Sequence, residues 1–195
     1  MHRKSFDALL SAAGLVVATV VLAASGLLFW GHSFVASNVH SQLAAQRIFM
    51  PPAGSPALAD PAVGPYLNRY AGQQIVNGDQ ARAYADHFIA VHLRASGGGR
   101  TYAELSAAAQ AAPTDTALAG KVASSFRGET LRGLLLNAYA FGKMGQLALV
   151  GALGTLFGGL ILLILTALGI RHARHTPMDV PLHVPGWHPE QLPAS

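Results

Sequence analysis

Histidine and carboxylate side chains are the groups of this sequence that could take part in acid–base catalysis or metal binding. The chain contains no cysteine. Without cysteine there are no disulfides, no thiolate nucleophiles and no cysteine-ligated zinc or iron–sulfur centres. The acids between residues 32 and 143 do not pair at close spacing; they are Asp60, Asp79, Asp86, Glu104, Asp115 and Glu129. Acid–base catalysis needs proton-transfer groups within reach of one substrate. A catalytic carboxylate pair would therefore have to assemble in three dimensions.

His92 lies in the most regular amphipathic segment, in line with Tyr84 and Phe88 on one helical face. A buried imidazole on that face could sense pH or act as a base, and Tyr84 could help to line a ligand pocket. We expect instead a core histidine bonded to a backbone carbonyl. His87 lies five residues earlier, about 140° away around the helix, so the two imidazoles cannot hold one metal ion together.

Four histidines near the end of the chain, His172, His175, His183 and His188, could in principle bind metal. We interpret them as part of a solvated tail, because cysteine is absent and no acid stands at ligand spacing. Gly120-Lys121-Val122 resembles the end of a phosphate-binding loop, but Val122 stands where Ser or Thr is needed. The sequence therefore predicts no catalytic, cofactor-binding or metal-binding residue, no cofactor and no enzymatic activity.

The composition indicates where the protein resides more clearly than what it does. Of the 195 residues, 51% are apolar and only 11% are charged, against about 25% in an ordinary soluble domain. The net charge is +4, and the Lys and Arg residues are scattered along the chain without a run. This argues against nucleic-acid binding, because that needs a basic patch.

Two segments without ionisable side chains, residues 8–31 and residues 144–170, account for the missing charge. A helix rises about 1.5 Å per residue, so each segment is long enough to cross a hydrocarbon layer about 30 Å thick. We predict two transmembrane helices. A buried helix of a soluble protein is the alternative for either segment. A cleaved signal peptide is the alternative for the first, with a passable cleavage site at residues 35–37, although its apolar stretch is long for a signal peptide.

The predicted organisation has five parts. Residues 1–7 form an N-terminal tail, residues 8–31 and 144–170 form the spans, residues 32–143 form a helical domain, and residues 171–195 form a Pro- and His-rich tail. Lys and Arg counts near the spans are almost equal on the two sides. Long loops cross a membrane largely regardless of charge, whereas short basic tails are retained. We therefore expect both termini to be cytoplasmic and residues 32–143 to be extracytoplasmic.

The predicted fold class is all-α, since no window shows alternation of period two. We expect the first helix to continue to Arg47, with Val35, Val39 and Leu43 on one face. We expect a helix over 121–143 to lead into the second span. Between them, the five prolines of residues 51–65 predict a connecting loop, followed by a short helix around 66–74. The next helix begins at Asn77 or Asp79 and ends at Gly97–Gly99. A capping box at 101–104 begins another, Pro113 ends it, and Thr114 or Asp115 can cap the next.

Small residues in the two apolar segments could allow close helix packing. Gly154 and Gly158, four residues apart and with Gly151 and Gly159 nearby, form one candidate contact, and Gly14 and Ala18 form another. The spacing is compatible with packing between the two spans, with homodimerisation, or with no specific role.

Several stretches together carry a resemblance to known proteins: residues 46–49 (QRIF), 51–56 (PPAGSP), 70–74 (YAGQQ), 84–93 (YADHFIAVHL) and 128–141 (GETLRGLLLNAYAF). Through them the chain resembles a family of two-span membrane proteins from high-GC Gram-positive bacteria. The resemblance implies a bacterial plasma membrane as the location. It brings no activity, cofactor or site residue to this chain.

Three functions follow as hypotheses. The first is a non-enzymatic accessory or scaffold protein of the bacterial envelope, which binds a membrane or envelope protein through its extracytoplasmic helical domain. The second is a ligand- or pH-sensing module that signals through a partner, and a pocket lined by Tyr84, Phe88 and His92 would favour it. The third is an envelope enzyme whose site the sequence does not reveal.

Overall fold

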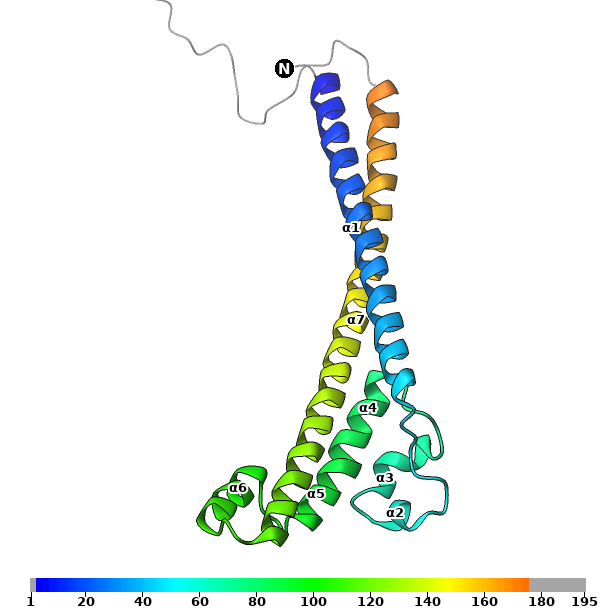
Figure 1. Cartoon of the computed structure of the whole chain (residues 1–195). Coiled ribbons are helices and arrows are strands. Elements are labelled where there is room, and N and C mark those ends of the chain that lie inside the picture. Colours follow the sequence, from blue (N-terminus) through cyan, green and yellow to red (C-terminus); the bar gives the residue numbers. More distant parts are fainter. Residues whose placement is uncertain (1–2, 176–195) are drawn as a thin grey trace, which may run out of the picture. The chain divides into compact units, whose positions relative to one another are not determined.

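The computed structural model describes residues 3–175, and within them the chain is all-helical. Two long helices, α1 (Arg3–Gln46) and α7 (Thr116–His175), flank a series of short ones (Figure 1). Contacts divide the chain into two compact units. The first, which we call the helix pair, comprises residues 1–29 and 150–195, and the second, which we call the helical domain, comprises residues 30–149.

The short elements of the helical domain are α2 (Pro56–Ala59), α3 (Gly64–Leu67), η1 (Asn68–Tyr70), α4 (Gly78–Tyr84), η2 (Ala85–Ile89), α5 (Ala90–Ser96) and α6 (Tyr102–Ala111). The Pro-rich segment is therefore a connection that contains two one-turn helices. The helix expected around 66–74 was wrong in extent: Gly72, with φ of 70°, lies in the left-handed region, which a helix cannot continue through.

Local capping signals act as the sequence predicts. The Asn77 side chain accepts a hydrogen bond from the Gln80 amide, and Thr101 forms a full capping box at the start of α6. Asp115 Oδ1 accepts from the Leu118 amide at the start of α7. At the end of α5, Gly98 and Gly99 have φ of 64° and 80°, a left-handed conformation that glycine adopts without strain.

In the helix pair, α1 and α7 run antiparallel and pack through small residues. The Ser25 hydroxyl donates to the Ala152 carbonyl over 2.8 Å, and both residues are buried. Buried residues recur every seventh position on each helix: Ser11, Ala18 and Ser25 on α1, and Ala152, Gly159, Thr166 and Ala173 on α7. Seven-residue spacing keeps one face of a slightly supercoiled helix on its partner.

The packing between the two apolar segments is therefore found within this unit, but not through every small residue that the sequence offered for it. A Cβ added to Gly154 or Gly158 would meet nothing within 4 Å, so neither glycine faces α1. Gly14 and Ala18 do face α7: a Cβ on Gly14 would lie 2.7 Å from Thr166 Oγ1, and Ala18 is fully buried. Gly151 and Gly159, which neighbour the first two glycines in the sequence, do face α1: added Cβ atoms there would lie 3.4 Å from Leu28 and 2.7 Å from Leu22.

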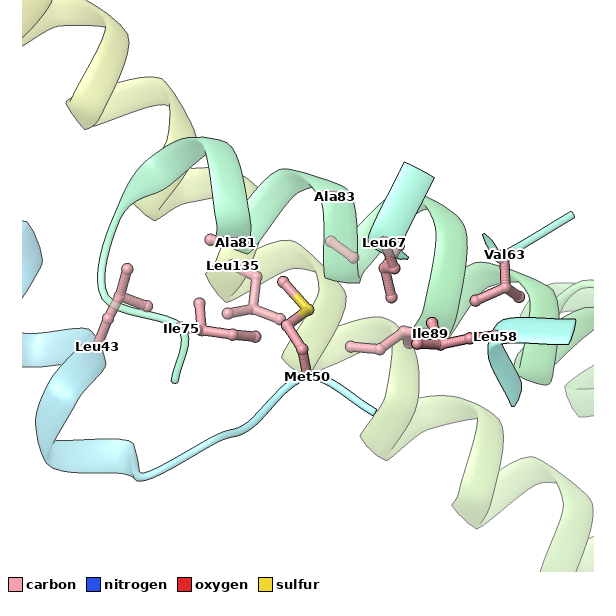
Figure 2. Close-up of a cluster of buried hydrophobic side chains, with 11 residues drawn as sticks. Leu43, Met50, Leu58, Val63, Leu67, Ile75, Ala81, Ala83, Ile89 and Leu135 are labelled. Carbon is pink, nitrogen blue, oxygen red and sulfur yellow. The ribbon is translucent and has the colours of Figure 1, made fainter. Parts of the chain in front are cut away.

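The core of the helical domain gathers side chains from distant parts of the sequence (Figure 2). Leu43 comes from the end of α1, Met50 and Ile75 from connecting segments, Leu67 from α3 and Leu135 from α7. Phe49 and Gln74 form a single antiparallel bridge that holds the two connecting segments together. Leu43 continues the face of Val35 and Val39, as the sequence predicts.

Helices α4 and α5 lie along α7 (Figure 1), and their junction is the π-helical turn η2. Ala81, Ala85 and Ile89 are buried, and Leu93 contacts Gly128 of α7. A π turn holds one residue more than an α turn, so it moves the buried face by one position. The expected dry face is confirmed in its first turns, where Tyr84 and Phe88 are half-buried against the core. It was wrong at His92, which is exposed, and Leu93 packs beside the core in its place.

The close approach of α4 to α7 at Gly78 gives a first prediction. A Cβ at Gly78 would lie 3.0 Å from Tyr139 Cα and 3.1 Å from the Ala138 carbonyl oxygen, both backbone atoms. We expect Gly78→Ala to lower the free energy of unfolding of the full chain in detergent by about 1–3 kcal/mol, because the helices must separate. Denaturant titration followed by circular dichroism measures it.

Gly133→Ala is the matched control. Gly133 lies inside α7 with nothing within 4 Å of an added Cβ. Alanine should there raise the free energy of unfolding by about 0.5–1 kcal/mol through helix propensity. Equal effects of the two substitutions would show that the close contact at Gly78 is absent.

Candidate binding surfaces of the helical domain

A ladder of polar contacts fixes α4 and η2 to α7. Lys143 Nζ lies 3.0 Å from Asp79 Oδ1, Arg82 donates to the Tyr139 hydroxyl over 2.8 Å, and Arg132 donates to Asp86 Oδ1 over 3.1 Å. Successive rungs are three or four residues apart on α4 and η2, so each helical turn contributes one. We call this set the polar ladder.

Each carboxylate of the helical domain has a structural partner. Apart from the two in the polar ladder, Asp60 accepts from the Ala62 amide, Glu104 from Thr101, Asp115 from the Leu118 amide, and Glu129 pairs with Arg132. The hydrogen bond from the Thr101 amide lowers the pKa of Glu104, with a second contribution from the Thr101 hydroxyl. These groups stabilise helix ends and helix contacts, and the structure does not gather them around a common point.

A polar cavity of about 430 Å³ lies where α1, α4 and α7 meet inside the helical domain. Its walls include His32, His40, Asp79, Tyr139 and Lys143. His32 Nδ1 lies 2.9 Å from the Gly145 carbonyl oxygen, so a proton on Nδ1 would be donated across to α7. The Lys143 ammonium contacts both Asp79 and Gln146. The positive charge of Lys143 and the negative charge of Asp79 therefore neutralise each other in the cavity wall.

A second polar hollow, of about 310 Å³, borders the first through Asp79. The imidazole of His87, on the π turn, stacks on the ring of Tyr66 with centroids 3.5 Å apart and planes 3° from parallel. Arg69 and Arg82 line the same hollow. His87 is thus held by an aromatic contact between η2 and α3, and the sequence, which places the two residues 21 positions apart, gives no signal for it.

An apolar groove of about 410 Å³ runs between α1 and α7. Its floor is made of Val35, Val39 and Leu43 from α1 and of Leu135 and Ala138 from α7. These residues are buried or half-buried, and all but Val35 belong to, or pack beside, the domain core.

The walls of the apolar groove are large and exposed. Phe34, Leu134 and Phe141 are 56%, 58% and 52% exposed. The only polar side chains in its lining are three amides, Asn38, Gln42 and Gln46, which follow one another at one-turn intervals along α1. Its lining carries no ionisable group, in contrast to the polar cavity.

The predicted His92 cluster is a stack of rings rather than a pocket. Tyr84 stacks on Phe88 with ring centroids 4.7 Å apart, and the His92 ring contacts Phe88 at a tilt of 37° with centroids 4.3 Å apart. His92 Nδ1 lies 2.8 Å from the Phe88 carbonyl oxygen, so the predicted bond to a backbone carbonyl is confirmed, although the side chain is exposed. Burial raises the pKa of Tyr84. None of the three rings lines the cavities or the groove described above.

His172 and His175 lie in the last turn of α7, whereas His183 and His188 fall outside the described residues. Within residues 3–175, no group of three or more His, Asp and Glu side chains is placed to hold a metal ion.

Comparison with known proteins finds no family model, no curated protein and no solved structure that matches the chain. The surfaces described above are therefore interpreted from their own geometry.

The polar ladder gives a second prediction. Asp86 and Arg132 are 27% and 33% exposed and join separate helices, so Asp86→Asn should lower the free energy of unfolding by about 1 kcal/mol. Glu129→Gln removes a carboxylate that pairs with the same arginine from within α7, and it should change stability by less than about 0.5 kcal/mol. Denaturant titrations at low and high salt measure both. A larger loss for Glu129→Gln would contradict this ordering.

Proposed function

We propose that this chain is an integral membrane protein of a bacterial envelope that crosses the plasma membrane twice, through residues 8–31 and 144–170. Both termini are cytoplasmic in this proposal, and residues 32–143 lie outside. The protein acts there as a non-enzymatic accessory or scaffold subunit that binds a membrane or envelope protein.

The observation that carries the proposal is the exposure of apolar side chains on α1 and α7. Both helices are long and apolar enough to cross a membrane, with mean hydropathies of 2.3 and 2.4 over their most apolar windows. Only 11% of each window is buried inside the structure. A core helix of a soluble protein would be mostly buried, whereas these side chains need an apolar solvent that the described chain does not supply.

Hydrogen bonding inside the helix pair supports the same environment. The Ser25 hydroxyl donates to the Ala152 carbonyl, and the Thr19 and Thr155 hydroxyls donate to carbonyls one turn earlier on their own helices. Polar groups without a hydrogen-bond partner are unfavourable in hydrocarbon, so hydroxyls that donate to backbone carbonyls suit a membrane-spanning segment.

A binding role rather than a catalytic one is favoured by how the helical domain uses its carboxylates. Each of the six is committed to a helix cap, a turn or an ion pair. The large exposed side chains of the domain are instead apolar: they form the groove walls and include Phe126, which is 55% exposed. Surfaces of this kind recognise other molecules by burial rather than by reaction.

A sensing role is the second candidate, and the polar cavity between α1, α4 and α7 is the observation that favours it. The cavity joins residues on both long helices, so a ligand there could bias their spacing. The pocket first expected for a sensor, around His92, is a stack of rings and gives that hypothesis less support.

The orientation can be tested with single cysteines, since the chain has none of its own. Ser96→Cys, at an exposed position in the helical domain, should react with a membrane-impermeant maleimide in intact cells. Ser195→Cys should react only after permeabilisation. Labelling of Ser195→Cys alone in intact cells would reverse the proposed orientation.

The scaffold role can be tested by site-specific photo-crosslinking in living cells. A photoreactive amino acid in place of Phe126, exposed on the helical domain, should yield one dominant adduct with another envelope protein. The same amino acid in place of Phe157, exposed on the helix pair, serves as the matched control and should give a different pattern. Repeated absence of any protein adduct at Phe126 would contradict a scaffold role of the domain.

A further inference from the structure

The apolar groove between α1 and α7 is half of an incomplete helix bundle. Its floor continues the domain core, and its walls expose Phe34, Leu134 and Phe141. Measured along α1 from Phe34 to Gln46, it is about 18 Å long at 1.5 Å per residue, or more than three helical turns. A volume of about 410 Å³ left open beside large exposed apolar side chains indicates a surface that is covered when the protein functions.

The same two helices show what covers a surface of this kind. Elsewhere on α7, α4 and α5 lie against Gly142, Leu135 and Gly128 and complete the packing there. The chain provides no such helix, within its described residues, for the groove walls. An occupant that lies along the groove with helices of its own would complete a bundle of four.

The chemistry of the lining selects the occupant. When a surface packs on an identical copy across a twofold axis, each residue near the axis meets itself. A lining with a charge would then repel its own copy, whereas this lining has none. Its polar residues, Asn38, Gln42 and Gln46, are amides, which both donate and accept hydrogen bonds and can therefore pair with themselves. A lipid chain would fit the apolar floor, but it offers no hydrogen-bonding group to these amides, which are exposed along one side of the groove.

We propose that the groove is a homodimer interface, in which two copies of this chain face each other through α1 and α7. The amides then form paired contacts in an otherwise apolar interface, a device that fixes register between helices at some cost in stability. Phe34 and Phe141 of each copy pack against the other. This inference adds a second copy of the chain to the proposed scaffold. It rests on the proposed function only because the experiment below uses the protein in native membranes.

The test uses the full chain in native membranes, co-expressed with two different affinity tags. Gln42→Cys, in the groove, should be joined into covalent dimers by a short bis-maleimide, and capture through one tag should recover the other. Ser37→Cys is the matched control. Ser37 is exposed on α1 but does not line the groove, so this variant should give at least fivefold less dimer.

A charge variant tests the same interface without cross-linking. Gln42→Lys places like charges face to face in the dimer, so it should shift the solubilised protein toward monomer in sedimentation experiments, whereas Ser37→Lys should not. Because both positions are exposed, the fold should tolerate either change. Circular dichroism of the two variants checks that they keep the helical content of the wild-type chain.

Three results would overturn the inference: no dimer from Gln42→Cys, an adduct of Gln42→Cys with a different protein in place of the second tag, or monomeric wild-type protein at every concentration tested. Fractionation of the same cells separates this failure from failure of the proposed function. A monomer in the membrane pellet contradicts only the homodimer, whereas a chain in the soluble fraction contradicts the membrane location.

Discussion

The apolar side chains of α1 and α7 impose the main constraint on this protein. Leu27 and Val150 remain 70% and 68% exposed, and many others on the two helices are similarly uncovered. At about 25 cal/mol per Å² of apolar surface, leaving so many large side chains in water would be strongly unfavourable. The antiparallel packing in the helix pair covers small residues and a few larger ones such as Leu22 and Leu28, and it leaves most of the large apolar side chains uncovered. The membrane location proposed above would supply the apolar medium that these side chains lack.

That constraint explains why the two faces of each helix in the pair differ. Ser11, Ala18 and Ser25 on α1 meet the small residues of α7, where close approach of backbones provides van der Waals contact and a hydrogen bond. The outward faces carry Leu, Val, Phe and Ile. The helical domain differs in having a core of large buried residues such as Met50, Leu67 and Leu135, although the groove walls stay exposed.

Much of the fold was predictable because its signals are local. The two apolar segments, the caps at Asn77, Thr101 and Asp115, and the end of α5 at Gly97–Gly99 each depend on a few neighbouring residues. The errors came where a contact between distant residues decides the outcome. The π turn at 85–89 moved the buried face from His92 to Leu93, and no pattern within the helix itself announces such a turn.

The candidate surfaces were less predictable for the same reason. The apolar groove depends on the register between Phe34 and Phe141, and the polar ladder joins residues 46 to 64 positions apart. One signal was available: Asn38, Gln42 and Gln46 recur at one-turn intervals beside the face of Val35, Val39 and Leu43. The amides and the apolar residues together predict a helix face that is apolar and bordered by amides. Only the structure shows which helix lies opposite this face.

Extraction of cell membranes with alkaline carbonate tests the central claim most directly. This treatment releases proteins held at a membrane by charge or by a partner, but it does not release chains whose helices cross the hydrocarbon layer. The account predicts that the full-length chain stays in the pellet after carbonate and enters solution only with detergent. Recovery of the intact chain in the carbonate supernatant would show that its apolar helices are covered by protein rather than by lipid.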